Sequence, residues 1–207
     1  MRDRVLNVLR LCFGLLAAVA LGVQAHRSAT LDLSMVSFFS YFTNLSNMAG
    51  VLVLLAGGAL GLLGRGRVPE LLRGAVVLYL TVTGLVYLVA LSGYDLGPLL
   101  PWVNTVVHRL MPLVLLADWL ADPPGRPIGR QRALCWLLFP LLYLPYSLIR
   151  GAVTDWYPYP FLDPRHPGGY SRVAVACTLV TLAFVGVGEL IRWAGNRLGE
   201  GREPRPS

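Results

Sequence analysis

The chain has 207 residues, of which 55% are hydrophobic and only 14% are charged, and this balance excludes an ordinary soluble domain. The formal net charge is +7, and all eighteen basic residues are arginine, so a rhodopsin-type photoreceptor, which needs a lysine for its Schiff base, is excluded too. The sequence therefore predicts an integral membrane protein. We attribute its positive charge to membrane topology and expect no nucleic-acid partner.

Six apolar stretches are long enough to cross a hydrocarbon core of about 30 Å as helices. In chain order they are predicted at about 5–25, 36–63, 72–92, 99–120, 133–150 and 171–193. Glycine, proline and charged residues punctuate the segments between them. We predict an all-α, polytopic protein of the cell membrane with one six-helix transmembrane domain over residues 1–194. The polar remainder, 195–207, is predicted to be a disordered tail.

The arginines predict the orientation, because cytoplasmic loops collect basic residues. With the N-terminus inside, thirteen arginines fall on the cytoplasmic side and four on the outer side, namely Arg27, Arg150, Arg165 and Arg172. This favours a cytoplasmic location for both termini. An alternative is that the first stretch, with its basic start and apolar middle, is a secretory signal peptide. Cleavage after Ala25 would leave five helices and reverse this arrangement.

The second stretch opens with the polar run "YFTNLSN", Tyr41–Asn47, and becomes small and apolar after Met48. Gly57 and Gly61 have the spacing that suits close helix packing. Thr43 is expected about seven residues past the start of its helix, roughly 10 Å below the outer surface. His108 is expected about nine residues into the fourth helix, at roughly 10 to 13 Å by the same rise. The sequence therefore predicts that Thr43 and His108 lie at matching depth.

Neighbouring polar residues extend both helix faces. Asn47 lies four residues after Thr43, and Asn104 lies four before His108, so each pair shares one face of its helix. Together they indicate a cavity open to the outer side. The alternatives are ordinary ones: a threonine that bonds its own helix, asparagines that link helices, and a packed histidine. Arg109 either snorkels outward or binds the carboxylate of a fatty-acid substrate.

The remaining features are an outer loop and three cysteines. The loop at 154–169 mixes aromatic residues with prolines, as an interfacial anchor or a lid over the cavity would. The cysteines, Cys12, Cys135 and Cys177, fall in three different stretches without paired spacing. We therefore expect no metal site, no disulfide framework and no cofactor.

Three motifs, "YFTNLSN", "WVNTVVHRLMP" and "DWYPYPF", resemble the bacterial predicted six-transmembrane family related to the androgen-induced and androgen-dependent transmembrane hydrolases of animals. Tyr41 and Thr43 match an early Y-x-T motif, and Trp102, Asn104 and His108 match a W-x-N-x-x-x-H motif followed by proline. The third motif matches more loosely. The resemblance implies a threonine nucleophile that cleaves lipid esters such as fatty acid esters of hydroxy fatty acids. Arg109 departs from the small polar residue of the animal pattern, which leaves the choice of substrate open.

The chemistry predicted from these residues is ester hydrolysis. Thr43 would attack the carbonyl, and His108 would serve as base and then as acid. Oxyanion donors or cavity-lining groups would come from Asn44, Asn47 or Asn104. The outer halves of the stretches hold no carboxylate, so the pair would act as a dyad unless a loop aspartate approaches it.

Two other classes stay open. A non-enzymatic carrier or binding protein for a lipid or small amphiphile would use the same polar stripe as its binding site, with His108 as a proton relay. Prolines in the fourth and fifth stretches, Pro112, Pro140 and Pro145, would suit the broken helices of such a carrier. The third class is a purely structural membrane protein. Membrane lipids or fatty-acid-derived esters are the expected partners, and the oligomeric state is not predicted.

Overall fold

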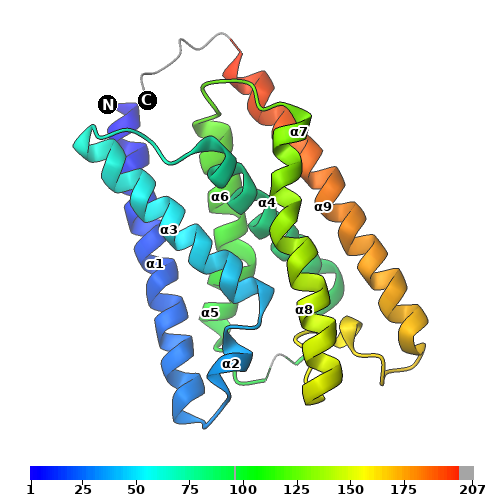
Figure 1. Cartoon of the computed structure of the whole chain (residues 1–207). Helices are drawn as coiled ribbons and strands as arrows, with labels where there is room; N and C mark the ends of the chain where they lie inside the picture. The colour runs from blue at the N-terminus through cyan, green and yellow to red at the C-terminus, as the bar shows by residue number, and fades with distance from the viewer. Residues whose placement is uncertain (96, 201–207) are drawn as a thin grey trace.

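The computed structural model describes residues 1–95 and 97–200, and its elements there are all helical (Figure 1). Six helical runs are long and apolar enough to cross a membrane, which confirms the predicted all-α, six-span fold.

The first three runs are α1 (Arg2–Thr30), α3 (Phe42–Leu63), and α4 (Glu70–Val86) with the π-helical turn η1 (Tyr87–Leu91). The fourth joins α5 (Pro101–Thr105), the π-helical turn η2 (Val106–Leu110) and α6 (Met111–Ala121). The fifth joins α7 (Arg130–Ala133), the 3₁₀ turn η3 (Leu134–Leu137) and α8 (Leu138–Thr154), and the sixth is α9 (Gly169–Gly199). Two short pieces, α2 (Met35–Phe38) and the 3₁₀ turn η4 (Pro160–Leu162), lie between spans.

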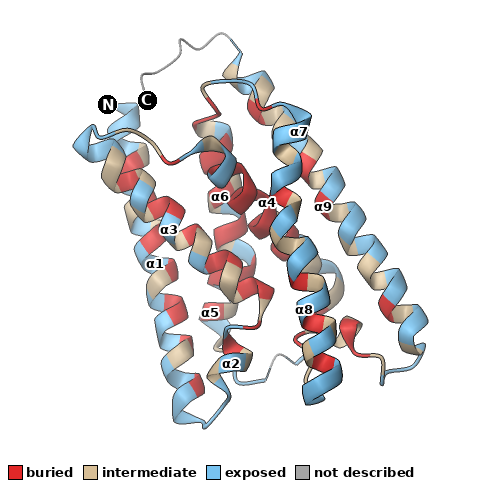
Figure 2. Cartoon of the chain, in the orientation of Figure 1, coloured by how far each residue is buried: buried red, intermediate tan, exposed pale blue. Residues whose placement is uncertain are grey.

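Helix α4 forms the centre of the bundle and contacts α3, α6 and α9. Its buried positions run without a gap from Arg73 to Leu80, whereas α8 and α9 bury few of their residues (Figure 2). The exposed side chains of α8 and α9 are largely leucine and valine. Apolar side chains on the outside are stable only against hydrocarbon, so this distribution fits a bundle surrounded by lipid.

Helices α1 and α3 pack closely along one side of the bundle. A Cβ atom at Gly61 would lie 2.3 Å from the Asn7 side chain, and one at Gly58 would lie 2.7 Å from the Asn7 carbonyl oxygen. Only glycine allows this approach. The close packing predicted for the small-residue half of the second span is thus confirmed, although Gly58 makes a contact that the spacing of Gly57 and Gly61 did not indicate.

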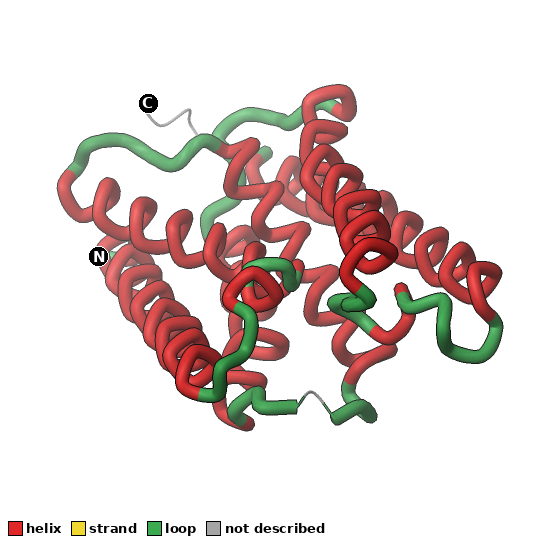
Figure 3. The backbone as a smooth tube through the Cα atoms, turned by 60° about the horizontal axis from the view of Figure 1, so that its bottom comes forward, coloured by secondary structure: helices red, strands yellow, loops and turns green. Residues whose placement is uncertain are grey.

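The start of α1 and the end of α9 lie at one end of the bundle, called here the terminal end (Figure 1). The opposite end is called the site end. Figure 3 turns the site end forward and shows the loops that join α1 to α3 and α8 to α9 there. Because the number of spans is even, the chain enters the first span and leaves the last one at the same end of the bundle.

The predicted second helix is interrupted, because α2 ends at Phe38 and α3 begins at Phe42. Two side chains hold the break: the Tyr143 hydroxyl donates to the Ser40 carbonyl at 2.8 Å, and Asn44 Nδ2 donates to the Phe38 carbonyl at 2.8 Å. These bonds satisfy backbone oxygens that a continuous helix would have satisfied itself. Thr43 is therefore the second residue of α3, and not about seven residues past the start of a helix.

Two predicted ends also differ from the structure. Helix α1 starts at Arg2 and passes Ala25 without a break, and its first half carries the buried Arg10. Helix α9 continues to Gly199, so the first five residues of the predicted tail are helical. The rest of that tail, residues 201–207, lies outside the described residues.

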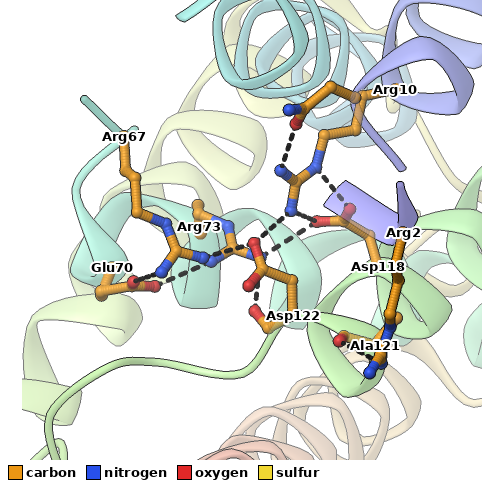
Figure 4. A network of polar contacts seen from close by, with 9 residues as sticks. Arg2, Arg10, Arg67, Glu70, Arg73, Asp118, Ala121 and Asp122 are labelled. Carbon is orange, nitrogen blue, oxygen red and sulfur yellow. Dashed lines mark hydrogen bonds and ion pairs between the residues drawn. The ribbon is translucent and has the colours of Figure 1, made fainter. Parts of the chain in front are cut away.

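A buried network of charges joins α1, α4 and α6 at the terminal end (Figure 4). Arg10 donates to Asp118 Oδ1 at 2.6 Å and to Asp122 Oδ2 at 2.7 Å. Arg73 donates to Asp118 Oδ2 at 3.1 Å, and Arg67 pairs with Asp122. We call Arg10, Arg67, Glu70, Arg73, Asp118 and Asp122 the ion network. Because each charge has an opposite partner, the network holds three helices together without an isolated buried charge.

Candidate functional site

Thr43 and His108 meet at the site end. Thr43 Oγ1 lies 3.2 Å from His108 Nε2, within hydrogen-bond distance, and both residues are only 6% exposed. Thr43 comes from the first turn of α3 and His108 from η2, segments separated by 65 positions in the chain. The structure thus brings together the two side chains that the depth argument paired.

Asn104 fixes the orientation of the imidazole. Its Oδ1 lies 2.7 Å from His108 Nδ1, while its Nδ2 donates to the Tyr87 hydroxyl at 2.9 Å. An amide oxygen can only accept, so Nδ1 carries the proton and donates it. Nε2 then presents its lone pair to the Thr43 hydroxyl. Asn104 meets the histidine through its oxygen, which makes it an orienting partner and not the oxyanion donor that the sequence suggested as one option.

Tyr87 is a site residue that sequence reasoning missed. Its ring stacks on the His108 imidazole, with centroids 4.5 Å apart and planes 20° apart. Its hydroxyl accepts the hydrogen bond from Asn104, and the residue is 3% exposed. The position of Tyr87 in the sequence could have indicated this role. Tyr87 lies a few residues before the end of the third span, and His108 lies a few residues after the start of the fourth. Because the two spans run in opposite directions, both residues are near the site end.

Both residues of this stack lie in π-helical turns, Tyr87 in η1 and His108 in η2. Pro112 has no N–H, so the His108 carbonyl lacks its usual partner four residues later. Gly84 allows α4 to approach, since a Cβ atom there would lie 3.0 Å from Pro112 Cβ and 3.3 Å from the His108 carbonyl oxygen. Such local helix widening is frequent at functional sites. Here it accompanies a close crossing of the two helices that carry the stacked rings.

Asn47 links the two helices below the pair. It is fully buried, and its Nδ2 donates to the Thr43 carbonyl at 2.9 Å and to the Val107 carbonyl at 3.1 Å. Both amide hydrogens are therefore engaged in positioning α3 against η2. Asn44, by contrast, lines the cavity described below, although its Nδ2 donates to the Phe38 carbonyl.

Arg109 lies away from the pair. Its side chain is exposed, and its guanidinium lies over the Tyr87 ring at 5.5 Å from the centroid, with Nη2 3.5 Å from the Tyr87 hydroxyl. It does not belong to the described residues that line the cavities beside Thr43. The structure therefore does not bring Arg109 to a position where it would hold a substrate carboxylate in the site.

Tyr159, in the loop between α8 and α9, is the second residue that sequence reasoning missed. Its hydroxyl accepts the Thr43 backbone N–H at 3.2 Å and lies 3.4 Å from Thr43 Oγ1. The residue as a whole is half-buried, and burial of its hydroxyl end raises the pKa of the phenol. The aromatic loop that the sequence left as an anchor or a lid thus reaches the threonine itself.

Two cavities meet at Thr43. The larger, about 620 Å³, is called the site cavity; its lining includes Thr43, Asn44, His108, Tyr159 and His166. The smaller, about 100 Å³, is called the apolar cavity and lies between α4, α8 and α9, with Phe184 and Leu141 in its wall. Thr43 and Tyr159 line both. A hydroxyl group is therefore placed where a mixed-polarity space adjoins an almost wholly apolar one.

Comparison of the chain with protein-family models, with curated proteins and with solved structures finds no match. A functional assignment therefore depends on what the site can do chemically. The site contains a hydroxyl, an imidazole that can accept its proton, and an amide that orients the imidazole. Nucleophile, base and orienting group in this order are the components of nucleophilic acyl transfer.

Proposed function

We propose that the protein is an integral membrane hydrolase that cleaves lipid esters with Thr43 as nucleophile and His108 as general base. The observation that carries this proposal is the 3.2 Å contact between Thr43 Oγ1 and His108 Nε2, with Nδ1 held by Asn104 at 2.7 Å. Asn104 takes the place that an asparagine or aspartate has in cysteine and serine hydrolases. The two residues predicted as a dyad are thereby extended to a row of three.

The reaction proceeds in two halves. Thr43 Oγ1 attacks the ester carbonyl carbon as its proton passes to His108 Nε2, and the carbonyl electron pair moves to oxygen. When the intermediate collapses, the bond to the leaving alcohol breaks and His108 returns the proton to that alcohol. Water then attacks the acyl-threonine with His108 again as base, which releases the fatty acid and restores Thr43.

The position of the two cavities supports a lipid ester as substrate. The apolar cavity suits an acyl chain, and the site cavity has room for the alcohol portion and for water. The resemblance of the three sequence motifs to the transmembrane threonine hydrolases points to the same class, including fatty acid esters of hydroxy fatty acids. No metal and no cofactor take part in this scheme.

The topology belongs to the proposal. The excess of arginine at the terminal end supports a topology with both termini in the cytoplasm and the site cavity at the outer face of a cell membrane. Affinity tags on the two termini test this. They are expected to resist protease in intact cells and to be cleaved in inverted vesicles, and the reverse pattern would contradict the orientation.

The activity is tested by labelling the purified protein in detergent with a fluorophosphonate probe. Labelling is expected for the wild type, is expected to disappear in Thr43→Ala and His108→Ala, and is expected to persist in Thr43→Ser. His26→Ala is the matched control, because His26 is exposed on α1 and does not belong to the described residues that line the two cavities. A folded wild type that takes no label at any pH, and hydrolyses no ester, would contradict the hydrolase.

A carrier for a lipid or small amphiphile is the second candidate, and the size of the site cavity favours it. A carrier binds its ligand without turning it over. Tight binding of an intact lipid ester by the wild type, unchanged in Thr43→Ala and without release of fatty acid, would support the carrier over the enzyme.

A further inference from the structure

We propose that Tyr159 is a catalytic residue of this hydrolase, whose hydroxyl donates a hydrogen bond to the oxyanion formed when Thr43 attacks. This inference depends on the proposed function. It concerns a residue in the loop between α8 and α9, outside all six spans.

The hydrogen bonds around Thr43 give the Tyr159 proton its direction. The Tyr159 hydroxyl accepts the Thr43 N–H at 3.2 Å, so one of its lone pairs is engaged there. The Thr43 hydroxyl donates its own proton to His108 Nε2, which leaves Thr43 Oγ1 as an acceptor. Tyr159 lies 3.4 Å from that oxygen. The resting arrangement is therefore a chain in which Tyr159 donates to Thr43 and Thr43 donates to His108.

The same donor is in reach of the charge that develops in the reaction. In the tetrahedral intermediate the new oxyanion is bonded to the carbon that Thr43 Oγ1 has attacked, only two bonds from Oγ1. The Oγ1 atom is then an uncharged oxygen bonded to two carbons, and the negatively charged oxyanion beside it is the stronger acceptor. A hydroxyl that points at Oγ1 before attack is thus placed to transfer its hydrogen bond to the oxyanion.

The start of α3 strengthens this donor. The first free N–H groups of the helix are capped by tyrosine hydroxyls, Phe42 N by Tyr143 at 3.1 Å and Thr43 N by Tyr159 at 3.2 Å. A hydroxyl that accepts from a helix N-terminus is polarised toward donation by the bond and by the helix dipole. The positive end of the dipole of α3, a helix of 22 residues, therefore makes the Tyr159 hydroxyl a stronger hydrogen-bond donor.

The asparagines suggested by the sequence are engaged elsewhere. Asn47 uses Nδ2 for two carbonyl groups, and Asn104 faces His108 with its oxygen. In the part of the chain that the structure describes, the side-chain hydrogen bonds to Thr43 Oγ1 come from His108 and Tyr159. Tyr159, whose hydroxyl also interacts with that of Tyr143, is thus the hydroxyl donor at this oxygen.

Packing holds the tyrosine in place before any substrate binds. Its ring stacks on Phe161 at 5.2 Å between centroids and meets the Tyr41 ring edge-on at 6.0 Å. Arg172, at the start of α9, donates to the Pro160 carbonyl at 2.6 Å and so fixes the residue that follows Tyr159. A donor that is already oriented requires no reorganisation as charge develops.

The test compares Tyr159→Phe with Tyr146→Phe, a matched control. Tyr146 also places a hydroxyl at the break before α3, 2.7 Å from Ser40 Oγ, but it makes no bond to Thr43 in the described structure and does not belong to the described residues that line either cavity. Hydrolysis of 4-methylumbelliferyl decanoate is measured in detergent. In Tyr159→Phe, kcat is expected to fall by roughly 10²- to 10³-fold with little change in KM, the range measured for loss of one oxyanion donor.

The second readout separates catalysis from structure. A decyl trifluoromethyl ketone forms an oxyanion adduct with the nucleophile, whereas the matched methyl ketone binds as an unreacted substrate mimic. Tyr159→Phe is expected to weaken the first inhibitor by about the same factor as kcat and to leave the second unchanged. Tyr146→Phe is expected to leave the ratio of the two affinities unchanged.

The results distinguish a failure of the proposed function from a failure of the role of Tyr159. A wild type without esterase activity contradicts the proposed function itself. An active wild type whose Tyr159→Phe variant keeps the wild-type kcat, or loses affinity for both ketones alike, overturns the role of Tyr159 alone. If Tyr159→Phe does not fold, 3-fluorotyrosine at this position replaces it. Its more acidic phenol should shift the loss of activity at high pH to lower pH, and an unchanged pH profile would contradict the donor role.

Discussion

The two ends of the bundle bury polar groups in opposite ways. At the terminal end, the ion network pairs full charges, such as Arg10 with Asp118 and Asp122. At the site end, Thr43, His108 and Asn104 form a row of hydrogen bonds that contains no carboxylate. Paired charges in a medium of low dielectric are expensive to separate, so they fix structure. Uncharged groups in a row can pass a proton, so the site end is the part of the molecule suited to chemistry.

The largest expected effect is at the site end. Thr43→Ala is predicted to lower ester hydrolysis by roughly 10³- to 10⁶-fold, the range over which loss of a nucleophile acts in related triads. Thermal unfolding should change little, because the ion network stays intact. Thr105→Ala is the control, since Thr105 is exposed and, among the described residues, its hydroxyl bonds to its own helix at the Pro101 carbonyl. Activity retained in Thr43→Ala would show that the active site is not at Thr43.

At the terminal end the effect is on stability. Arg10→Met leaves Asp118 without its closest partner and Asp122 without one of its arginines, and it is predicted to lower the free energy of unfolding by about 3–5 kcal/mol. Activity per folded molecule should be unchanged. Arg197→Met, which breaks an exposed pair with Glu200, should have an effect of about 1 kcal/mol or less. Denaturation in detergent, followed by tryptophan fluorescence, measures the free energy of unfolding of both variants. Equal losses in the two variants would contradict the role of the ion network in holding the three helices together.

The orienting role of Asn104 gives the next effect. Asn104→Leu removes the acceptor at His108 Nδ1 and is predicted to lower kcat by about 10²-fold. Nitrogen-15 NMR of labelled histidine should show a proton on Nδ1 in the wild type and a mixture of tautomers in the variant. A wild-type imidazole with its proton on Nε2 would contradict the proposed direction of the hydrogen bonds.

The smallest effect is the response of the terminal end to acid. Burial opposes the charge of Asp122, but the hydrogen bond from Arg10 and the charges of Arg73 and Arg67 outweigh it and lower the pKa of this carboxyl to about 2. The stabilisation is therefore fully present above the ordinary pKa of 3.8 and is lost as pH falls through 2. It amounts to at most about 2 kcal/mol. Asp122→Asn should abolish this part of the acid response, and an unchanged acid midpoint would contradict it.

The sequence predicted the spans because length and hydropathy decide what crosses a membrane. It also paired Thr43 with His108, which lie in contact, although the depth argument assumed an unbroken helix before Thr43 and α3 begins only at Phe42. The break before Phe42 was not predictable, because Tyr143, about a hundred residues away, satisfies the Ser40 carbonyl there. Tyr159 was missed for a similar reason: its hydroxyl reaches Thr43 from a loop, and hydropathy does not determine the path of a loop.

The most direct test of the central claim is to map the fluorophosphonate adduct by peptide mass spectrometry. The adduct is predicted on Thr43 Oγ1 in the wild type and in His26→Ala, and on no residue in His108→Ala. An adduct on another hydroxyl, such as Ser46 or Thr83, or an adduct on Thr43 that persists in His108→Ala, would contradict a threonine nucleophile activated by this histidine.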